Sequence, residues 1–296
     1  MLAAALLGIS LSGPLVRISQ ARPLAIASGR LAFSLVIIGI ALIATGQWRQ
    51  WRHLTRRELL TAMGAGCMLA LHFWSWNSSV ALTSVAASVV LVNTQPVVVA
   101  LLSVYWLGEA PTRRQWIGIG VAMLGALIIA WPDFATGASE SMAHPKAWLG
   151  DLLALIGALT AATYFSVGRR LRSKLDLWPY VGLVYSVCLV TLVLLAALTN
   201  TSLLPQPPRE LAIFAALALG PMLIGHTGLN WALKYSPAYI VNLTLLGEPI
   251  GATLIAALLP GIREVPGPTV FFGGAIVCAG VLLASQGGST SSGTSG

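Results

Sequence analysis

Ten long, continuous apolar runs occupy most of this 296-residue chain. A helix needs about 20 mainly apolar residues to cross the hydrocarbon core of a membrane, whereas a barrel strand is an alternating segment of about 10. The runs are long and do not alternate, so they predict an all-α integral membrane protein. The ten predicted transmembrane helices cover 2–19, 23–45, 58–79, 83–107, 114–131, 148–168, 178–199, 210–233, 237–259 and 267–285.

The charged residues agree with a chain that lies in lipid. They make up 9% of the sequence, compared with about 25% in soluble domains. A net charge of +8 could indicate nucleic acid, but the basic residues lie in short clusters between the apolar runs, as they do at cytoplasmic membrane flanks. We therefore expect the lipid bilayer as a partner and no nucleic acid.

The distribution of Lys and Arg predicts the orientation. If the N-terminus is inside, the inner loops contain Arg49, Arg52, Arg56, Arg57, Arg113, Arg114, Arg169, Arg170, Arg172, Lys174 and Lys234. The outer loops then contain only Arg17, Arg22, Lys146, Arg209 and Arg263. Short cytoplasmic loops carry an excess of Lys and Arg. Both termini are therefore expected in the cytoplasm, and the first residues are expected to remain as a transmembrane helix rather than a cleaved signal.

One long segment occurs twice. Residues 76–130 recur in diverged form at 229–284. Matching positions include Asn77 with Asn230, Gln95-Pro96 with Glu248-Pro249, Gly118 with Gly273, and Gly125 with Gly280. Such internal repeats are common in secondary transporters, where the substrate site lies at the junction of two related halves.

The number of helices in each copy predicts how the halves are related. The first half, 1–131, contains five runs, so the second half, 148–285, must start from the opposite side of the membrane and form an inverted repeat. A polar segment, 132–147, is expected to be the outer loop between them. Residues 286–296 read as a flexible Gly/Ser tail or a remnant of cloning.

Glu248 lies near the centre of the ninth run, roughly 16 Å from each surface at 1.5 Å per residue. A carboxylate there is costly unless it is protonated, paired or facing water, so Glu248 is a candidate proton carrier or ligand for a substrate amine. The alternative is a protonated Glu that fixes helix register. Pro249 removes one helix hydrogen bond and predicts a hinge, as does Pro96 in the first copy.

Polar and aromatic residues at helical spacing predict a cavity. His72 and Trp76 are four residues apart in the third run, and His226 and Asn230 are four apart in the eighth, so each pair shares a helix face. The alternative for each residue is hydrogen bonding between helices. The predicted cavity residues are His72, Trp76, Gln95, Tyr164, His226, Asn230, Tyr239, Asn242 and Glu248.

Arg30 lies about seven residues inside the second run, where a charge must find water or a partner. Its side chain either snorkels to the outer surface or pairs with a substrate carboxylate or with Glu248.

No catalytic motif stands out. The sequence contains no HExxH, GxSxG or Walker pattern, and its four histidines lack metal-ligand spacing. We expect no enzymatic activity, no cofactor and no metal. A channel would need rings of like residues or a continuous polar stripe, whereas these polar residues cluster at mid-membrane.

Several short motifs together resemble the drug/metabolite transporter superfamily, and within it the EamA-type proteins with ten helices in two five-helix units. In the first copy these motifs are 29–33, 81–87, Gln95-Pro96 and 108–112, and in the second copy 232–237, 247–249 and 273–280. Members often have Glu-Pro in both copies, whereas the first copy here has Gln95-Pro96. The chain also resembles amino-acid exporters of the YddG type.

The resemblance implies a secondary transporter that works by alternating access. It would export amino acids or similar small metabolites across the bacterial cell inner membrane. Export of lipophilic cations or drugs is the alternative, and a channel is a weaker one. Because both halves belong to one chain, a monomer suffices.

Overall fold

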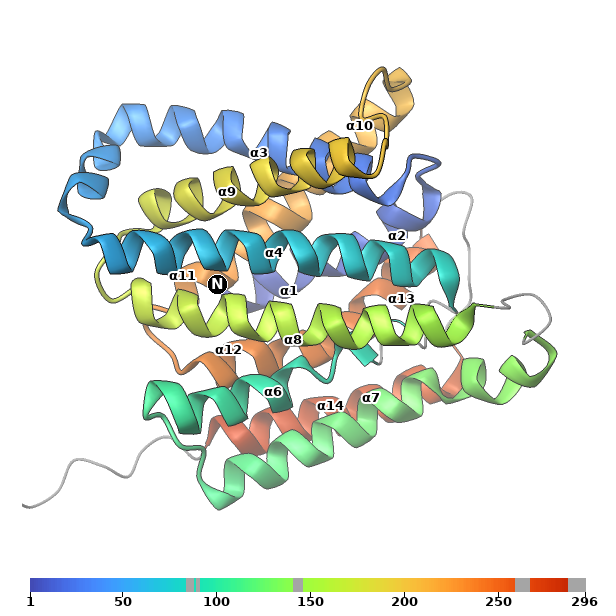
Figure 1. Cartoon of the computed structure of the whole chain (residues 1–296). Coiled ribbons are helices and arrows are strands. Elements are labelled where there is room, and N and C mark those ends of the chain that lie inside the picture. The colour runs from blue at the N-terminus through green and yellow to red at the C-terminus, as the bar shows by residue number, and fades with distance from the viewer. Residues whose placement is uncertain (84–87, 89–90, 141–145, 259–266, 287–296) are drawn as a thin grey trace, which may run out of the picture.

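The computed structural model describes residues 1–83, 88, 91–140, 146–258 and 267–286. These residues form helices joined by short turns, with no strand among them. Most of the helices run along one common direction, so that the turns between them gather at two opposite ends of the bundle (Figure 1).

The helices of the first half are α1 (Leu2–Ser10), α2 (Ser12–Ile18), α3 (Pro23–Thr45), α4 (Arg56–Leu82), α6 (Gln95–Leu102) and α7 (Arg113–Glu140), with the 3-10 helix η1 (Gln47–His53) and the π-helix η2 (Ser103–Leu107). Those of the second half are α8 (Ala147–Leu171), α9 (Leu177–Leu198), α10 (Pro208–Leu217), α11 (Thr227–Ala232), α12 (Ala238–Leu243), α13 (Glu248–Leu258) and α14 (Pro268–Ser285), with the π-helix η3 (Ala218–His226) and the 3-10 helix η4 (Thr244–Gly247).

Local sequence explains where several helices begin and end. Thr55 and Glu58 form a capping box at the start of α4, which satisfies backbone N–H groups that have no partner inside the helix. Pro23 begins α3, where its missing N–H costs nothing. Gly46 ends α3 with φ +67°, a left-handed conformation that glycine adopts without steric cost.

Six helices in the described part of the chain are long and apolar enough to cross a membrane. They are Pro23–Thr45, Arg56–Leu82, Ala147–Leu171, Leu177–Leu198, Pro208–Ala232 and Pro268–Ser285, and two shorter apolar helical stretches cover Leu2–Ile18 and Gln95–Leu107. Large apolar side chains such as Ile40, Ile43 and Phe272 lie exposed on the outside of the bundle. Lipid tails would cover these side chains, as in a multi-pass membrane protein.

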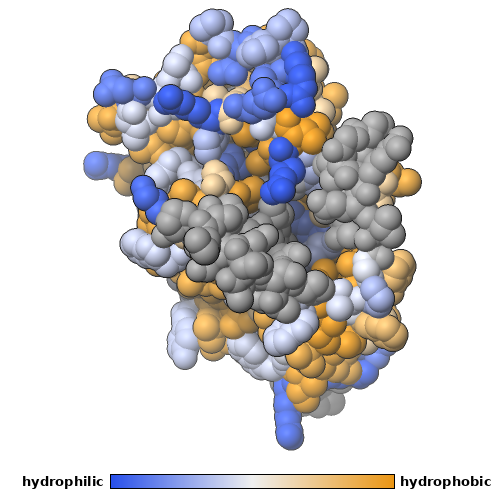
Figure 2. All heavy atoms as spheres, turned by 90° about the vertical axis from the view of Figure 1, so that its right-hand side faces the viewer, coloured by the Kyte–Doolittle hydropathy of each residue, from blue (hydrophilic) through white to orange (hydrophobic). Residues whose placement is uncertain are grey.

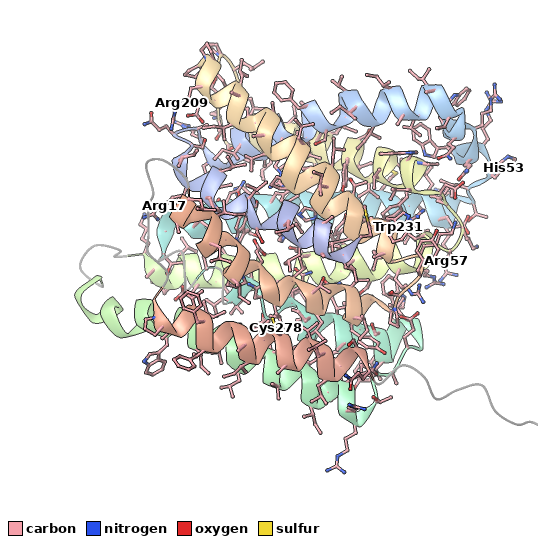
Figure 3. The ribbon with its side chains drawn as sticks, turned by 180° about the vertical axis from the view of Figure 1, so that it is seen from behind. Arg17, His53, Arg57, Arg209, Trp231 and Cys278 are labelled. Atoms are coloured by element: carbon pink, nitrogen blue, oxygen red, sulfur yellow. The ribbon has the colours of Figure 1, made fainter. Side chains whose placement is uncertain are left out.

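Basic residues of the predicted outer loops and of the predicted inner loops lie at opposite ends of the bundle. Figure 3 shows Arg17 and Arg209 at one end and His53 and Arg57 at the opposite end. Figure 2 looks onto the end that carries Arg17 and Arg209, where hydrophilic residues gather in the upper part, around the start of α10.

Two predicted continuous helices are instead interrupted near their middle. In the run 83–107, a turn at 93–94 precedes α6, and in the run 237–259, α12 passes through the 3-10 turn of η4 before α13 begins. Pro96 and Pro249 each occupy the second position of the new helix. Proline fits the first turn of a helix but not its interior, which explains why both helices restart there.

The predicted loop 132–147 is also partly helical, because α7 continues to Glu140. The helical backbone continues through position 132 without a break. Residues 141–145 and the tail 287–296 lie outside the described residues.

Helix packing relates the two halves in a regular way. In contacts between the halves, α4 of the first half packs along α8 of the second, and the corresponding η3 of the second half packs along α1 of the first. Likewise α6 contacts α8, and its counterpart α13 contacts α1. The last helices of each half, α7 and α14, lie side by side (Figure 1).

Glycines bring α7 and α14 into backbone contact. A Cβ at Gly118 would lie 2.7 Å from the carbonyl oxygen of Gly280, and one at Gly125 would lie 2.6 Å from that of Gly273. These spacings leave no room for a side chain, which is how small residues allow membrane helices to approach. Gly120 differs, because its Cβ position meets open space and it takes no part in this contact.

Candidate functional site

A cavity lies inside the bundle beside the two interrupted helices. Helices of both halves form its wall, including α3, α4, α6, α8 and α13. The space open to the centres of water-sized molecules is about 50 Å³, enough for a few water molecules. A solute as large as a metabolite would need the wall to move apart.

Six of the residues singled out in the sequence lie on this wall. They are Arg30, His72, Trp76, Gln95, His226 and Glu248. Gln95 and Glu248 both stand at the first position of the helices that restart. The break in each helix therefore places the matching residues of the two copies at the same cavity.

The other four predicted cavity residues pack behind the wall and bind one another or a neighbouring helix. Tyr164 accepts a hydrogen bond from Asn230, and Asn242 accepts one from Gln95. Tyr239 donates to Gln115 on α7 at 3.1 Å. These contacts correspond to the alternative of hydrogen bonding between helices.

Sequence reasoning did not single out Asn93, Phe73 or Phe165, which also line the cavity. Asn93 is a polar residue in an apolar run two positions before Gln95, which was an available signal. Phe73 and Phe165 are apolar residues in apolar helices, and nothing in their local sequence distinguishes them from lipid-facing phenylalanines.

Arg30 does not reach the surface. Only 1% of the residue is exposed, and its guanidinium carbon lies 4.2 Å from the centre of the Phe73 ring. This distance is that of a cation–π contact. All three guanidinium nitrogens lack a hydrogen-bond partner among the described residues.

Other polar atoms on the cavity wall are also left without partners. Trp76 Nε1, Asn93 Nδ2 and His226 Nδ1 are buried and make no hydrogen bond within the described part of the chain. Buried polar groups are nearly always hydrogen-bonded in native proteins. Their concentration around one cavity indicates a place that receives water or a ligand.

Among the described residues, Glu248 is the one carboxylate on the cavity wall. It is partly buried, and none of the ion pairs among the described residues includes it or Arg30. Its position at the start of α13 is favourable, because the positive end of a helix dipole stabilises a nearby negative charge.

Aromatic rings surround His226. The rings of Phe73, Phe165 and His72 lie 5.3, 6.1 and 6.3 Å from it, centre to centre. Nδ1 of His72 lies 2.9 Å from the carbonyl oxygen of Gly157. A carbonyl oxygen only accepts hydrogen bonds, so Nδ1 carries a proton and donates it to this bond. The described wall of the cavity thus combines the Arg30 guanidinium, the Glu248 carboxyl and several aromatic rings.

Ion pairs and hydrogen bonds connect the helices at the end of the bundle that carries His53 and Arg57. Arg169 pairs with Glu109 at 2.6 Å and donates to the carbonyl of Leu233 at 2.7 Å. Arg172 is buried and donates to the carbonyls of Asn230 and Leu175. Arg169 thus ties the start of the second half to the loop before α7 and to the end of α11.

Asp176 belongs to the same end of the bundle and accepts hydrogen bonds from Gln50 at 2.8 Å and Lys234 at 3.3 Å. The hydrogen bond from Gln50, helped by Lys234, holds the pKa of this carboxyl below its usual value. A lowered folded pKa stabilises the folded state above the unfolded pKa of about 3.9, and this contribution is lost as the pH falls through the folded pKa.

The Asp176→Asn variant is therefore expected to lower the apparent melting temperature at pH 7 by about 1–3 °C, the effect of a solvent-screened pair of less than about 1 kcal/mol. Melting curves recorded in detergent between pH 3 and 7 test this. The difference between the two proteins should become smaller toward the acid end, and a difference that grows toward low pH would contradict the assignment.

A family model for EamA-like transporters matches residues 1–131 and again residues 148–286. Curated relatives include an uncharacterized transporter of Archaeoglobus fulgidus, 29% identical over 51% of this chain and 49% of its own length. Protein RarD of Streptomyces exfoliatus is 31% identical over 41% of this chain and 39% of its own. The uncharacterized transporter YdfC of Bacillus subtilis is 27% identical over 68% and 62%.

The chain thus spans between about two fifths and three fifths of these relatives. A protein of known crystal structure shares the fold, with a TM-score of 0.74 and 18% identity over 96% of this chain and 95% of that one. The two family matches together cover most of the chain. With its apolar helices, it is a multi-pass membrane protein that belongs to the EamA-like transporter family of the drug/metabolite transporter superfamily.

Proposed function

We propose that the protein is a secondary transporter that exports amino acids or similar small metabolites by alternating access, as YddG-type exporters do. The observation that carries this proposal is the cavity at the two helix breaks, with Arg30 and Glu248 on its wall. Interrupted helices that meet at a central polar site are typical of secondary transporters.

Two inverted halves of five helices each, 1–131 and 148–285, are proposed as the moving parts, which gives ten membrane-spanning helices. The matched packing of α4 with α8 and of η3 with α1 supports this relation. The reciprocal contacts of Gly118 with Gly280 and Gly125 with Gly273 support it too, because the repeat exchanges one pair for the other. Rocking about the helix breaks at Pro96 and Pro249 would open the cavity to each side in turn.

The proposed orientation places the end with His53 and Arg57 in the cytoplasm of a bacterial cell, at the inner membrane, with both termini inside. The excess of basic residues expected for that side supports the assignment. Both halves lie in one chain, so we propose a monomer as the working unit.

Export of lipophilic cations is the second candidate. Glu248 and the aromatic rings of Phe73, Trp76 and Phe165 would suit such a ligand. Arg30 opposes it, because a buried guanidinium on the same wall would repel a cation.

Purified protein in proteoliposomes tests the proposal. Vesicles loaded with unlabelled amino acids, nucleosides or cationic drugs are offered the same compound in labelled form, and counterflow is measured. We expect saturable counterflow of at least one amino acid, which requires a carrier. Flux that rises linearly with concentration, without counterflow, would indicate a channel, and counterflow of cationic drugs alone would support the second candidate.

A further inference from the structure

We propose that Arg30 binds the carboxylate of the transported solute, and that this solute is an amino acid in its zwitterionic form with an apolar side chain. This inference rests on the proposed transport function and names the chemistry of the same cavity.

The cavity wall carries an excess of hydrogen-bond donors without partners. Arg30 presents three nitrogens that donate only, and Trp76 Nε1 and Asn93 Nδ2 are donors as well. A ligand that satisfies them must be rich in acceptors. A carboxylate has two oxygens that accept about four hydrogen bonds between them.

The Arg30 guanidinium lies against the ring of Phe73. The guanidinium carbon lies 4.2 Å from the centre of the Phe73 ring, and the three nitrogens are buried with no hydrogen-bond partner among the described residues. The edge of a guanidinium matches the two oxygens of a carboxylate, which it can bind with two parallel hydrogen bonds. The side chain is already buried and packed, so binding orders little that is not ordered in the empty protein.

The charges of Arg30 and Glu248 limit which solutes fit the cavity. Arg30 and Glu248 lie on one cavity wall without an ion pair between them. An amine without a carboxylate would add a second positive charge beside Arg30 and offer no acceptor to its N–H groups, and an acid without an amine would offer no cation to Glu248. A buried charge without a partner is strongly unfavourable. A solute with both charges offers a partner to both residues at once.

The rest of the wall indicates the side chain. Phe73, Phe165, Val92 and Leu245 present apolar groups to the same cavity. Burial of apolar area is favourable at about 25 cal/mol per Å², and the described part of the wall has no second carboxylate and no Lys to bind a charged side chain. An aliphatic or aromatic amino acid fits these surroundings.

Matched ligands test the inference on the purified full-length protein. Leucine is compared with 3-methylbutylamine, which lacks its carboxylate, and with 4-methylpentanoate, which lacks its amine. Phenylalanine, phenethylamine and 3-phenylpropanoate form a second set. Equilibrium binding by calorimetry is expected to favour at least one of the two amino acids over both of its analogues by at least tenfold, about the loss for one charge-assisted hydrogen bond to a buried partner.

Two variants test the two charged residues separately. Arg30→Gln should weaken binding of the amino acid at least about tenfold and leave the amine unaffected or improved, whereas Glu248→Gln should do the same for the amino acid and spare the acid. Arg17→Gln, which removes an exposed arginine at the end of the bundle, is the matched control and should bind as the unmodified protein does.

The inference is overturned if the amine or the acid binds as tightly as the amino acid, or if Arg30→Gln binds the amino acid unchanged. If neither amino acid binds but another solute shows counterflow, the inference of a zwitterion with an apolar side chain is wrong and transport stands. If no solute in the counterflow panel moves, the transport proposal itself fails. The comparison of ligands on the unmodified protein decides the question even where a variant folds poorly.

Discussion

Proteoliposomes that carry Glu248→Gln are expected to lose all acceleration of transport by a pH gradient. We propose that Glu248 exchanges a proton for the amine of the solute, so that proton and solute compete for one carboxylate and must move in opposite directions. Glutamine has nearly the same shape and cannot take up or release a proton. The variant can still carry solute down its own gradient, but it cannot use the proton gradient.

The measurement is counterflow at saturating solute with and without an imposed pH difference. Asp176→Asn is the matched control, because it removes a carboxylate at the end of the bundle, away from the cavity, and should keep the response to pH. If Glu248→Gln responds to the gradient as the unmodified protein does, the carboxyl is not the proton carrier. The alternative of a Glu that fixes helix register would then gain support.

The second large effect is expected from Gly125→Leu. Any side chain at this position meets the carbonyl oxygen of Gly273 and the amide of Val277, both at 2.6 Å from the new Cβ. These are backbone atoms that cannot move without separating α7 from α14. Overpacking costs about 1–3 kcal/mol in ordinary cores and should cost more where two backbones touch, so we expect the apparent melting temperature to fall by roughly 5 °C or more.

Gly120→Leu is the matched control, since the same substitution on the same helix meets nothing within 4 Å and should change the melting temperature little. Both variants are compared in one detergent at one heating rate, because membrane proteins often unfold irreversibly. Equal losses in the two variants would mean that leucine is poorly tolerated anywhere on α7, and the close glycine contact would lose its assigned role.

The positions of the helices follow from the sequence in most places, because the membrane imposes one simple demand. Every backbone group in lipid must be paired within its own helix, and a run of about 20 apolar residues shows where this occurs. The predicted run 178–199 and the observed α9 differ by one residue at each end. The prediction fails where Pro96 and Pro249 restart a helix, since a break is tolerated there only because surrounding protein satisfies the freed groups.

The residues of the candidate site are predictable to a lesser extent. His72, Trp76 and Glu248 can be recognised in the sequence as polar or amphipathic residues in apolar runs, and all three line the cavity. Tyr164 and Asn230 carry the same signal, yet they bind each other behind the wall. Spacing along a helix shows which residues share a face, but the choice of neighbour that covers the face depends on contacts between helices distant in sequence.

The sequence alone determined that this chain crosses a membrane repeatedly and that its second half repeats the first, because hydropathy and repetition are properties of the chain itself. Only the tertiary structure decided the state of Arg30. Its place in α3 allowed the side chain to reach the surface or to turn inward, and packing against Phe73 from α4 holds it inside. The free energy of a charge in a membrane depends on what surrounds it in space, and those surroundings are assembled from both halves.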